Sequence, residues 1–165
     1  MSPPDLLPEA VADNLDRLYR SAWAMCGSRE DAEDLVQETC ARVLSKRRVI
    51  ASEADALPYL HSVLRNTFIS SLRTRSRRPQ TSSIDDAPEP RLAAPASSSP
   101  ASVLAAREVF AAIAALPEDQ RDAVAAVDVA GLSYAEAAES IGVPTGTIMS
   151  RLYRGRNRVA EAIGE

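Results

Sequence analysis

The stretch SYAEAAESIGVPTGTIMSRLYRGRNRVAEAI, residues 133–163, decides the fold of the C-terminal part of the chain. Ser133, followed three residues later by Glu136, has the pattern of a capping box and predicts the start of a short helix. Gly142 ends that helix, and Pro144 begins a second helix that runs to the end of the stretch. Two helices joined by a tight turn that contains glycine make a helix-turn-helix.

The second helix of this motif has two different faces. Its apolar positions, with Gly155 between them where another backbone can approach closely, are Ile148, Leu152, Val159 and Ile163. The opposite face carries hydroxyls first and arginines further along: Thr147, Ser150, Arg151, Arg154 and Arg158. This order suits a helix in the major groove of DNA, where early residues read base edges and cations bind phosphates. The alternative is a solvated arginine face, but the capped helix and turn before it favour DNA binding.

Further helices are expected on both sides of a linker. An alanine-rich segment at about residues 101–115 predicts one helix, and Pro117 opens another that reaches about Asp128. Residues 79–100 are rich in Pro and Ser and hold almost no large apolar side chains, so they predict a flexible linker.

The N-terminal part predicts three helices. Residues 13–26 form an apolar helical face, and Gly27 stops that helix. Ser28, with Asp31 three residues later, predicts the start of a second helix that runs toward Arg48. The third helix has Pro58 near its first turn and ends in an arginine run. The side chains expected to face inward include Leu44 in the second helix and Leu72 in the third.

Composition agrees with helical domains. The chain has 165 residues, of which 45% are hydrophobic, many of them alanine, and 4% are aromatic, which favours small helical cores over sheets. We therefore expect an all-α protein with two small helical domains, residues 1–78 and 101–165, joined by the linker at 79–100.

Charge alternates along the chain although the net charge is only −4. The net charge is −6 over residues 1–40, +7 over 41–78, −5 over 101–145 and +2 over 146–165. Such asymmetry predicts both positively and negatively charged partners, which the small net charge of the whole chain does not reveal.

The acidic stretch DAEDLVQE, residues 31–38, is open to three interpretations. On a helix, Asp31, Asp34 and Glu38 share one side with Gln37 adjacent. A metal site would need ligands from several elements and usually a histidine, and catalytic carboxylates would need a pocket, so neither is favoured. A solvated face and a surface for a basic partner remain.

The third helix and its arginine tail predict contact with nucleic acid. Away from its apolar stripe we place Tyr59, His61, Arg65, Asn66 and Ile69, and the tail adds Arg73, Arg75, Arg77 and Arg78. Cations bind phosphates, and planar or amide side chains hold exposed bases of a single strand. The helix dipole would explain one or two of these arginines but not all of them. We expect no catalytic role for His61, because no nucleophile or carboxylate partner is evident.

The remaining features concern the cell compartment. Cys26 and Cys40 form no CxxC pair and are expected to be small buried hydrophobes in a reducing compartment. No run of about 18 apolar residues is present, and the N-terminus does not have the pattern of a secretion signal. We expect a cytoplasmic protein with no direct membrane insertion.

Three segments in order carry a resemblance to a known family: LYRSAWAMCGSREDAEDLVQETCARVL (18–44), PYLHSVLRNTFISSLRTRSRR (58–78) and ALPEDQRDAVAAVDVAGLSYAEAAESIGVPTGTIMSRLYRGRNRV (115–159). Together they resemble the extracytoplasmic-function (group IV) sigma factors of the sigma-70 family. That family has two helical domains, region 2 and region 4, joined by a flexible linker. The resemblance implies a promoter-specificity subunit of RNA polymerase that acts by binding, with no enzyme activity, cofactor, metal or small-molecule substrate.

The resemblance also assigns roles to residues. Asp31, Asp34, Gln37 and Glu38 would contact the β′ clamp of core RNA polymerase, and region 4 would dock on the β flap. The minus-ten element of promoter DNA would be bound by the loop at about 49–55 and by Tyr59, His61, Arg65, Asn66, Arg73 and Arg75. The minus-thirty-five element would be read by Thr145, Thr147, Ser150, Arg151, Arg154 and Arg158. The acidic linker residues Asp85, Asp86 and Glu89 would pass near the polymerase active centre.

Some positions depart from the family, and two other classes of function remain. Met149 stands where lysine is common, Ser62 where arginine is common, and Tyr59 where tryptophan is common. The family is often held by an anti-sigma factor, which we expect as a further partner. The alternatives are a stand-alone helix-turn-helix regulator that binds duplex DNA as a dimer, and a sigma mimic that sequesters an anti-sigma factor.

Overall fold

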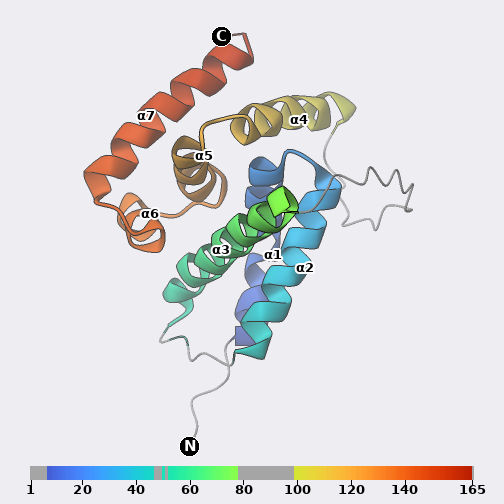
Figure 1. Cartoon of the computed structure of the whole chain (residues 1–165), viewed down its shortest axis with the longest axis vertical. Helices are drawn as coiled ribbons and strands as arrows, with labels where there is room; N and C mark the ends of the chain where they lie inside the picture. The colour runs from blue at the N-terminus through green and yellow to red at the C-terminus, as the bar shows by residue number, and fades with distance from the viewer. Residues whose placement is uncertain (1–6, 47–49, 51, 78–98, 165) are drawn as a thin grey trace, which may run out of the picture.

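The protein is helical throughout the part that the structure describes. The computed structural model describes residues 7–46, 50, 52–77 and 99–164, and within these it contains no strand. The elements run in the order α1 (Leu7–Cys26), α2 (Arg29–Ser45), the short 3-10 helix η1 (Glu53–Asp55), α3 (Ala56–Arg77), α4 (Pro100–Ala114), α5 (Glu118–Val124), the π-helical segment η2 (Ala125–Val129), α6 (Tyr134–Ile141) and α7 (Thr145–Ala162) (Figure 1). The predicted all-α fold is confirmed.

Helices α1, α2 and α3 form a bundle that we call the N-terminal module (Figure 1). Leu18, Val43, Leu60 and Leu64 are fully buried in its core. The predicted start of α2 is confirmed, because the Ser28 hydroxyl accepts a hydrogen bond from the Asp31 N–H at 3.2 Å.

Two side chains of this module do not face inward as predicted. Leu44 is 47% exposed and Leu72 is 41% exposed. Both lie near the C-terminal ends of their helices, α2 and α3, where fewer neighbouring side chains are available to cover them. Leu72 lines a surface groove instead, described below.

Helices α4 to α7 form the C-terminal module, and α6 with α7 is the predicted helix-turn-helix. Both hydrogen bonds of the capping box are present: the Glu136 N–H donates to the Ser133 hydroxyl at 3.1 Å, and the Ser133 N–H donates to the Glu136 carboxylate at 2.9 Å. Gly142 ends α6 with a φ of +85°, a left-handed conformation that glycine adopts without strain. Pro144 is the N-cap of α7.

Gly155 marks a close approach between α7 and α5, as the sequence suggested. A Cβ placed on Gly155 would lie 2.8 Å from Val124 Cγ2 and 3.5 Å from Gln120 Cβ. Ile148 and Leu152, on the same side of α7, are buried in the core of the module. The apolar face of α7 is thereby fixed against α5, and its polar face points outward.

The two modules pack directly on each other, which sequence analysis did not anticipate. Ala125 of the C-terminal module belongs to the core around α1, and Ala24 and Leu57 belong to the core around α5. The Trp23 ring on α1 meets the Phe110 ring on α4 edge to face, with centroids 4.7 Å apart. In Figure 1, α5 lies between α7 and the bundle, so α2 and α7 are on opposite sides of the molecule. Residues 78–98, which include most of the predicted linker with Asp85, Asp86 and Glu89, lie outside the described residues.

Candidate functional site

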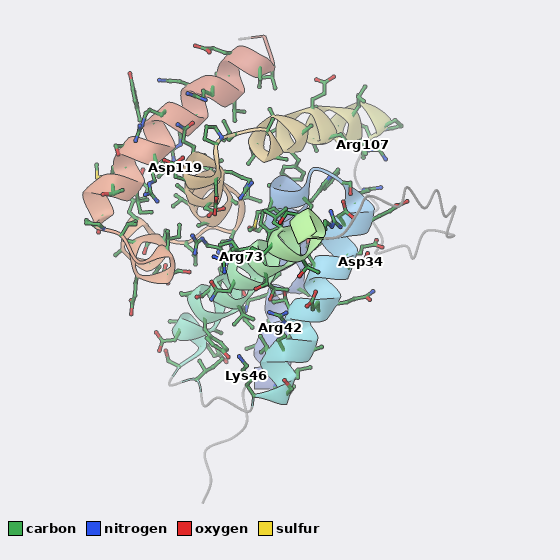
Figure 2. All side chains as sticks on the ribbon, viewed as in Figure 1. Asp34, Arg42, Lys46, Arg73, Arg107 and Asp119 are labelled. Atoms are coloured by element: carbon green, nitrogen blue, oxygen red, sulfur yellow. The ribbon has the colours of Figure 1, made fainter. Side chains whose placement is uncertain are left out.

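The acidic stretch forms an exposed strip along α2. Asp34, Gln37 and Glu38 are exposed and Asp31 is half-exposed, so the four residues of the predicted polymerase contact share one accessible surface. Figure 2 shows Asp34 on the flank of α2 that faces away from α7. Glu33, within the same stretch, is buried instead. We call Asp31, Asp34, Gln37 and Glu38 the acidic strip.

Two members of the acidic strip form ion pairs with arginines of the same module. Asp31 lies 3.1 Å from Arg75 of α3, and Glu38 lies 2.8 Å from Arg42 one turn further along α2. All four side chains are at least 38% exposed. Surface pairs of this kind contribute about 0–1 kcal/mol, so a cationic partner could displace the arginines at little cost.

A groove of about 320 Å³ runs beside the acidic strip. Leu35, Phe68 and Leu72 supply apolar surface to it, and Asp34 and Glu38 are on its acidic side. Cys26 also lines the groove; burial, and secondarily the charge of Asp31, raises the pKa of its thiol to about 12. The thiol is therefore protonated at neutral pH, and Cys26 and Cys40 are both free and partly buried.

The predicted minus-ten surface on α3 is only partly exposed. Asn66, Arg73 and Arg75 are exposed, and Tyr59 is half-buried. The short 3-10 helix η1 precedes α3, while residues 47–49 and 51 of the predicted minus-ten loop, and Arg78, lie outside the described residues.

His61 is not on this surface, so its predicted placement is wrong. The side chain has no exposed area, and its Nε2 lies 2.7 Å from the hydroxyl of Ser21 on α1. The Ser21 hydroxyl also donates to the carbonyl oxygen of Ala125 at 3.4 Å, which links α3, α1 and η2. Burial, and secondarily the charge of Arg65, lowers the pKa of His61 to about 4. The imidazole is therefore neutral at pH 7, because burial disfavours its charged form.

Arg65 is also engaged, and its partner comes from the other module. Its Nε donates to an Asp122 carboxylate oxygen at 2.9 Å, with the Arg65 side chain 20% exposed and the Asp122 side chain 2% exposed. Arg121 lies 3.4 Å from the same carboxylate, and its guanidinium is 4.7 Å from the centre of the Phe68 ring on α3. Burial raises the pKa of Asp122, and the charges of Arg121 and Arg65 oppose that rise.

The predicted minus-thirty-five residues occupy the outward face of α7. Thr145, Ser150, Arg154 and Arg158 are exposed, while Thr147 and Arg151 are half-buried. Arg151 Nε lies 3.8 Å from Asp119 of α5. The same face also presents Met149, 54% exposed, and Tyr153, 70% exposed.

A further ion pair fixes α7 against the segment behind it. Arg156 donates from Nε and Nη2 to the two carboxylate oxygens of Asp128 on η2, at 2.9 and 2.6 Å. A bidentate guanidinium–carboxylate pair adds geometric definition as well as energy. Arg156 therefore holds α7 against η2, whereas the Arg154 and Arg158 side chains are exposed.

Sequence reasoning missed the residues that join the modules: Ser21, Trp23, Phe110, Arg121 and Asp122. Arg121 and Asp122 belong to α5, where every residue from Gln120 to Val124 is buried although three of these side chains are polar or charged. In EDQRDAV, such side chains resemble an ordinary solvated surface. The sequence signal that neighbouring helices cover this segment on more than one side is its apolar continuation, AAV at residues 125–127.

The described residues include neither a membrane-spanning helix nor a cluster of metal ligands. Among the described ranges, no helix has the length and apolar character needed to cross a membrane. Within the same residues, no group of three or more His, Cys, Asp or Glu side chains could hold a metal ion.

Each of the two modules matches a family of sigma factor domains. Residues 10–78 match the family described as Sigma-70 region 2, and residues 106–159 match the family described as Sigma-70, region 4. The chain is 33% identical over 158 residues to the ECF RNA polymerase sigma factor EcfG of Rhodopseudomonas palustris, covering 94% of this chain and 84% of the relative. It is also 33% identical to the ECF RNA polymerase sigma factor SigE of Mycolicibacterium smegmatis, covering 95% of this chain and 61% of that longer protein.

Solved structures agree on the fold. The sigma factor RpoE of Bartonella quintana, crystallised with the anti-sigma factor NepR, matches with a TM-score of 0.70 and 27% identity, covering 94% of this chain and 95% of RpoE. CnrH, solved with the cytosolic domain of CnrY, matches in fold with a TM-score of 0.65 and 18% identity, covering 98% of this chain and 90% of CnrH. With both sigma regions present in order and relatives aligned over most of its length, the chain belongs to the extracytoplasmic-function sigma factors of the sigma-70 family.

Proposed function

We propose that this protein is the sigma subunit that binds core RNA polymerase and directs transcription from specific promoters. The observation that supports this most is the pairing of an exposed acidic strip on α2 with an arginine-bearing helix-turn-helix at the opposite side of the molecule (Figure 1). A stand-alone DNA-binding protein has no need for the acidic strip. Residues 1–78 would act as region 2, residues 101–165 as region 4, and residues 79–100 as the linker.

Polymerase docking would rest on the acidic strip. Asp31, Asp34, Gln37 and Glu38 present carboxylates and an amide to a basic surface of the β′ clamp, and electrostatic complementarity of this kind sets register and association rate. Region 4 would dock separately on the β flap. The groove beside the strip offers apolar contact as well, through Leu35 and Leu72.

Promoter recognition would use both modules. Thr145, Thr147, Ser150, Arg151, Arg154 and Arg158 on α7 would read and hold the minus-thirty-five duplex, while Tyr59, Arg65, Asn66, Arg73 and Arg75 would hold the melted minus-ten strand. We leave His61 out of the second set because its side chain is fully buried. Opening DNA costs about 1.4 kcal/mol per stacking step, and base stacking on aromatic side chains returns about 1–3 kcal/mol per base.

We further propose that the protein acts in the cytoplasm by binding alone, without enzyme activity, cofactor, small-molecule substrate or membrane insertion. An anti-sigma factor would control it, which is supported by the solved complex of the similar sigma factor RpoE with the anti-sigma factor NepR. Its release would make the protein available to core polymerase.

Run-off transcription with purified core polymerase tests the proposal. Promoters are first selected from a genomic DNA pool with the reconstituted holoenzyme, and we expect a discrete transcript only when this chain is added. A stand-alone regulator would bind the duplex without polymerase and yield no transcript. A sigma mimic would bind neither promoter nor core, so either result would refute the proposal.

Charge reversal tests the polymerase contact itself. We expect Asp34→Lys combined with Glu38→Lys to abolish co-elution with core polymerase, because two attractive charges become repulsive. Both side chains are exposed, so circular dichroism should be unchanged. The control is Glu9→Lys with Asp13→Lys, two exposed acids on α1 of the same module. Equal core affinity for both double variants would reduce the acidic strip to a solvated face.

A further inference from the structure

Arg151, one of the residues proposed to contact the minus-thirty-five duplex, is paired with a carboxylate of the same module. Its Nε lies 3.8 Å from an Asp119 carboxylate oxygen in the first turn of α5, on the side of that helix that faces α7 (Figure 2). The Arg151 side chain is only 21% exposed, against 45% for Asp119. Arg154 and Arg158 are exposed, and within the described ranges they form no ion pair. Arg151 is therefore held in a way that its neighbours on α7 are not.

The carboxylate that faces Arg151 is itself fixed in place. The second oxygen of Asp119, Oδ1, accepts a hydrogen bond from the Gln120 N–H at 3.0 Å, and Oδ2 is the oxygen nearest Arg151. The two helices are also fixed against each other, because Gly155 of α7 lies close to Val124 and Gln120 of α5. The direction of the Arg151 guanidinium is thus set from a second helix and not by α7 alone.

This pairing leaves one edge of the guanidinium available. A guanidinium has five N–H donors in a planar fork, and Asp119 is nearest to Nε. The two Nη nitrogens remain, and neither of them forms a hydrogen bond to another described residue. Two parallel donors of this kind fit the O6 and N7 acceptors of guanine in the major groove.

The carboxylate also changes which part of DNA suits Arg151. A phosphate that approached Arg151 would meet the negative charge of Asp119, and like charges disfavour that approach. A base edge carries no net charge, so the nearby carboxylate does not repel it. Phosphate contacts position a protein on DNA without reading sequence, whereas contacts to base edges specify it. The pair therefore favours base reading by Arg151, and leaves phosphate binding to the unpaired Arg154 and Arg158.

We propose that Asp119 is a positioning residue that determines promoter specificity: it orients Arg151 so that the guanidinium reads one guanine of the minus-thirty-five element, and its charge keeps Arg151 away from the phosphates. Asp119 acts through Arg151 and does not touch the DNA. The inference rests on the proposed reading of the minus-thirty-five duplex by α7. Without Asp119, Arg151 can turn to a neighbouring phosphate, so the protein should lose selectivity rather than affinity.

The test uses the reconstituted holoenzyme, a selected promoter fragment, and fragments in which each base pair of the minus-thirty-five element is replaced in turn. Competition binding gives the relative affinity for every fragment. We expect the wild type to prefer G·C at one position by about tenfold, and Arg151→Ala to lose this preference. Asp119→Ala should reduce it to about twofold, while the affinity for a duplex without a promoter does not fall.

Three further variants separate positioning from other roles. Glu118→Ala removes an exposed acid from the same turn of α5 and should keep the full preference. Asp119→Glu restores a carboxylate and should recover most of the preference that Asp119→Ala loses. In an Arg151→Ala background, Asp119→Ala should change no base preference further, because the two residues act as a unit.

Four results would overturn the inference. The first is a wild type without a G·C preference that depends on Arg151, and the second is a preference that survives in Asp119→Ala. The third is an equal loss of affinity for all fragments in Asp119→Ala, which is the sign of a purely structural role. The fourth is a change of base preference by Asp119→Ala in the absence of Arg151, because Asp119 would then contact DNA itself.

Two measurements accompany the binding test. Asp119 is partly exposed, so we expect Asp119→Ala to fold, and urea denaturation of the variant verifies this. Run-off transcription by the wild type judges the proposed function separately. If the wild type initiates from the selected promoters and Asp119→Ala keeps the same base preferences, only the positioning role of Asp119 is refuted.

Discussion

Met149 is an exposed apolar side chain on the outward face of α7, at a position where the family commonly has lysine. It is adjacent in sequence to Ser150 and one turn after Thr145, two of the residues proposed to contact the minus-thirty-five duplex. A thioether can contact a thymine methyl but cannot bind a phosphate. The protein therefore has no cation at this position of α7.

We expect Met149→Lys to strengthen binding of the holoenzyme to its selected minus-thirty-five duplex at low salt. One added phosphate contact should steepen the dependence of log affinity on log salt by about 0.9. The measurement is a salt titration between about 50 and 200 mM. Leu104→Lys adds the same charge on the exposed side of α4 and should leave the slope unchanged; equal slopes for both variants would place Met149 away from the DNA.

His61 shows how a residue-level prediction failed. It lies one residue after Leu60 and three before Leu64, so the helical period alone puts it on the buried stripe of α3. Its polar character led us to place it outside. The partner that makes its burial acceptable, Ser21, is 40 positions away in sequence, and no local pattern reveals such a pairing.

The elements themselves were largely predictable, because their ends are set by local chemistry. Ser28, the Ser133–Glu136 box, Gly142 and Pro144 all mark helix boundaries where predicted. The acidic strip was likewise placed on an exposed helix face. Docking of the modules was not predictable, because its partners are far apart in sequence: Asp122 of α5 pairs with Arg65 of α3, and Phe110 of α4 packs on Trp23 of α1.

The close contact between α5 and α7 makes a prediction at the scale of these helices. In Gly155→Ala the new Cβ would meet Val124 Cγ2 at 2.8 Å, and valine in a helix has little rotamer freedom to move away. We expect overpacking to lower the free energy of unfolding by about 1–3 kcal/mol, before a gain of up to about 1 kcal/mol from helix propensity. Urea denaturation measures the balance, which we expect to be destabilising.

Gly146 is the matched control, since it is also in α7 but has nothing within 4 Å of its Cβ position. We expect Gly146→Ala to be neutral or stabilising by up to about 1 kcal/mol, because only the propensity effect remains. If Gly155→Ala were as stable as Gly146→Ala, α7 would not be held against α5 at the observed distance.

At the scale of the whole molecule, the buried bridge through His61 links stability to pH. The bridge suits a neutral imidazole: in the tautomer with its hydrogen on Nε2, the ring donates to Ser21, whose hydroxyl donates to the Ala125 carbonyl oxygen. Protonation would place a charge in a fully buried position close to Arg65. His61 therefore binds a proton less readily in the folded protein than in the unfolded chain.

We expect the free energy of unfolding to decrease as pH falls. The pKa of His61 is about 4 in the folded protein against 6.5 ordinarily, so the unfolded chain binds a proton first, and stability is lost from about pH 6.5 down to about pH 4. Between about pH 7 and pH 5 this amounts to roughly 2 kcal/mol. The raised pKa of Asp122 acts in the opposite direction at acid pH.

His61→Gln keeps a hydrogen-bonding group beside Ser21 but cannot titrate, so its urea midpoint should fall less than that of the wild type over this range. Parallel pH profiles for the two proteins would mean that His61 is accessible to protons in the folded state, and that the modules do not close over it in solution.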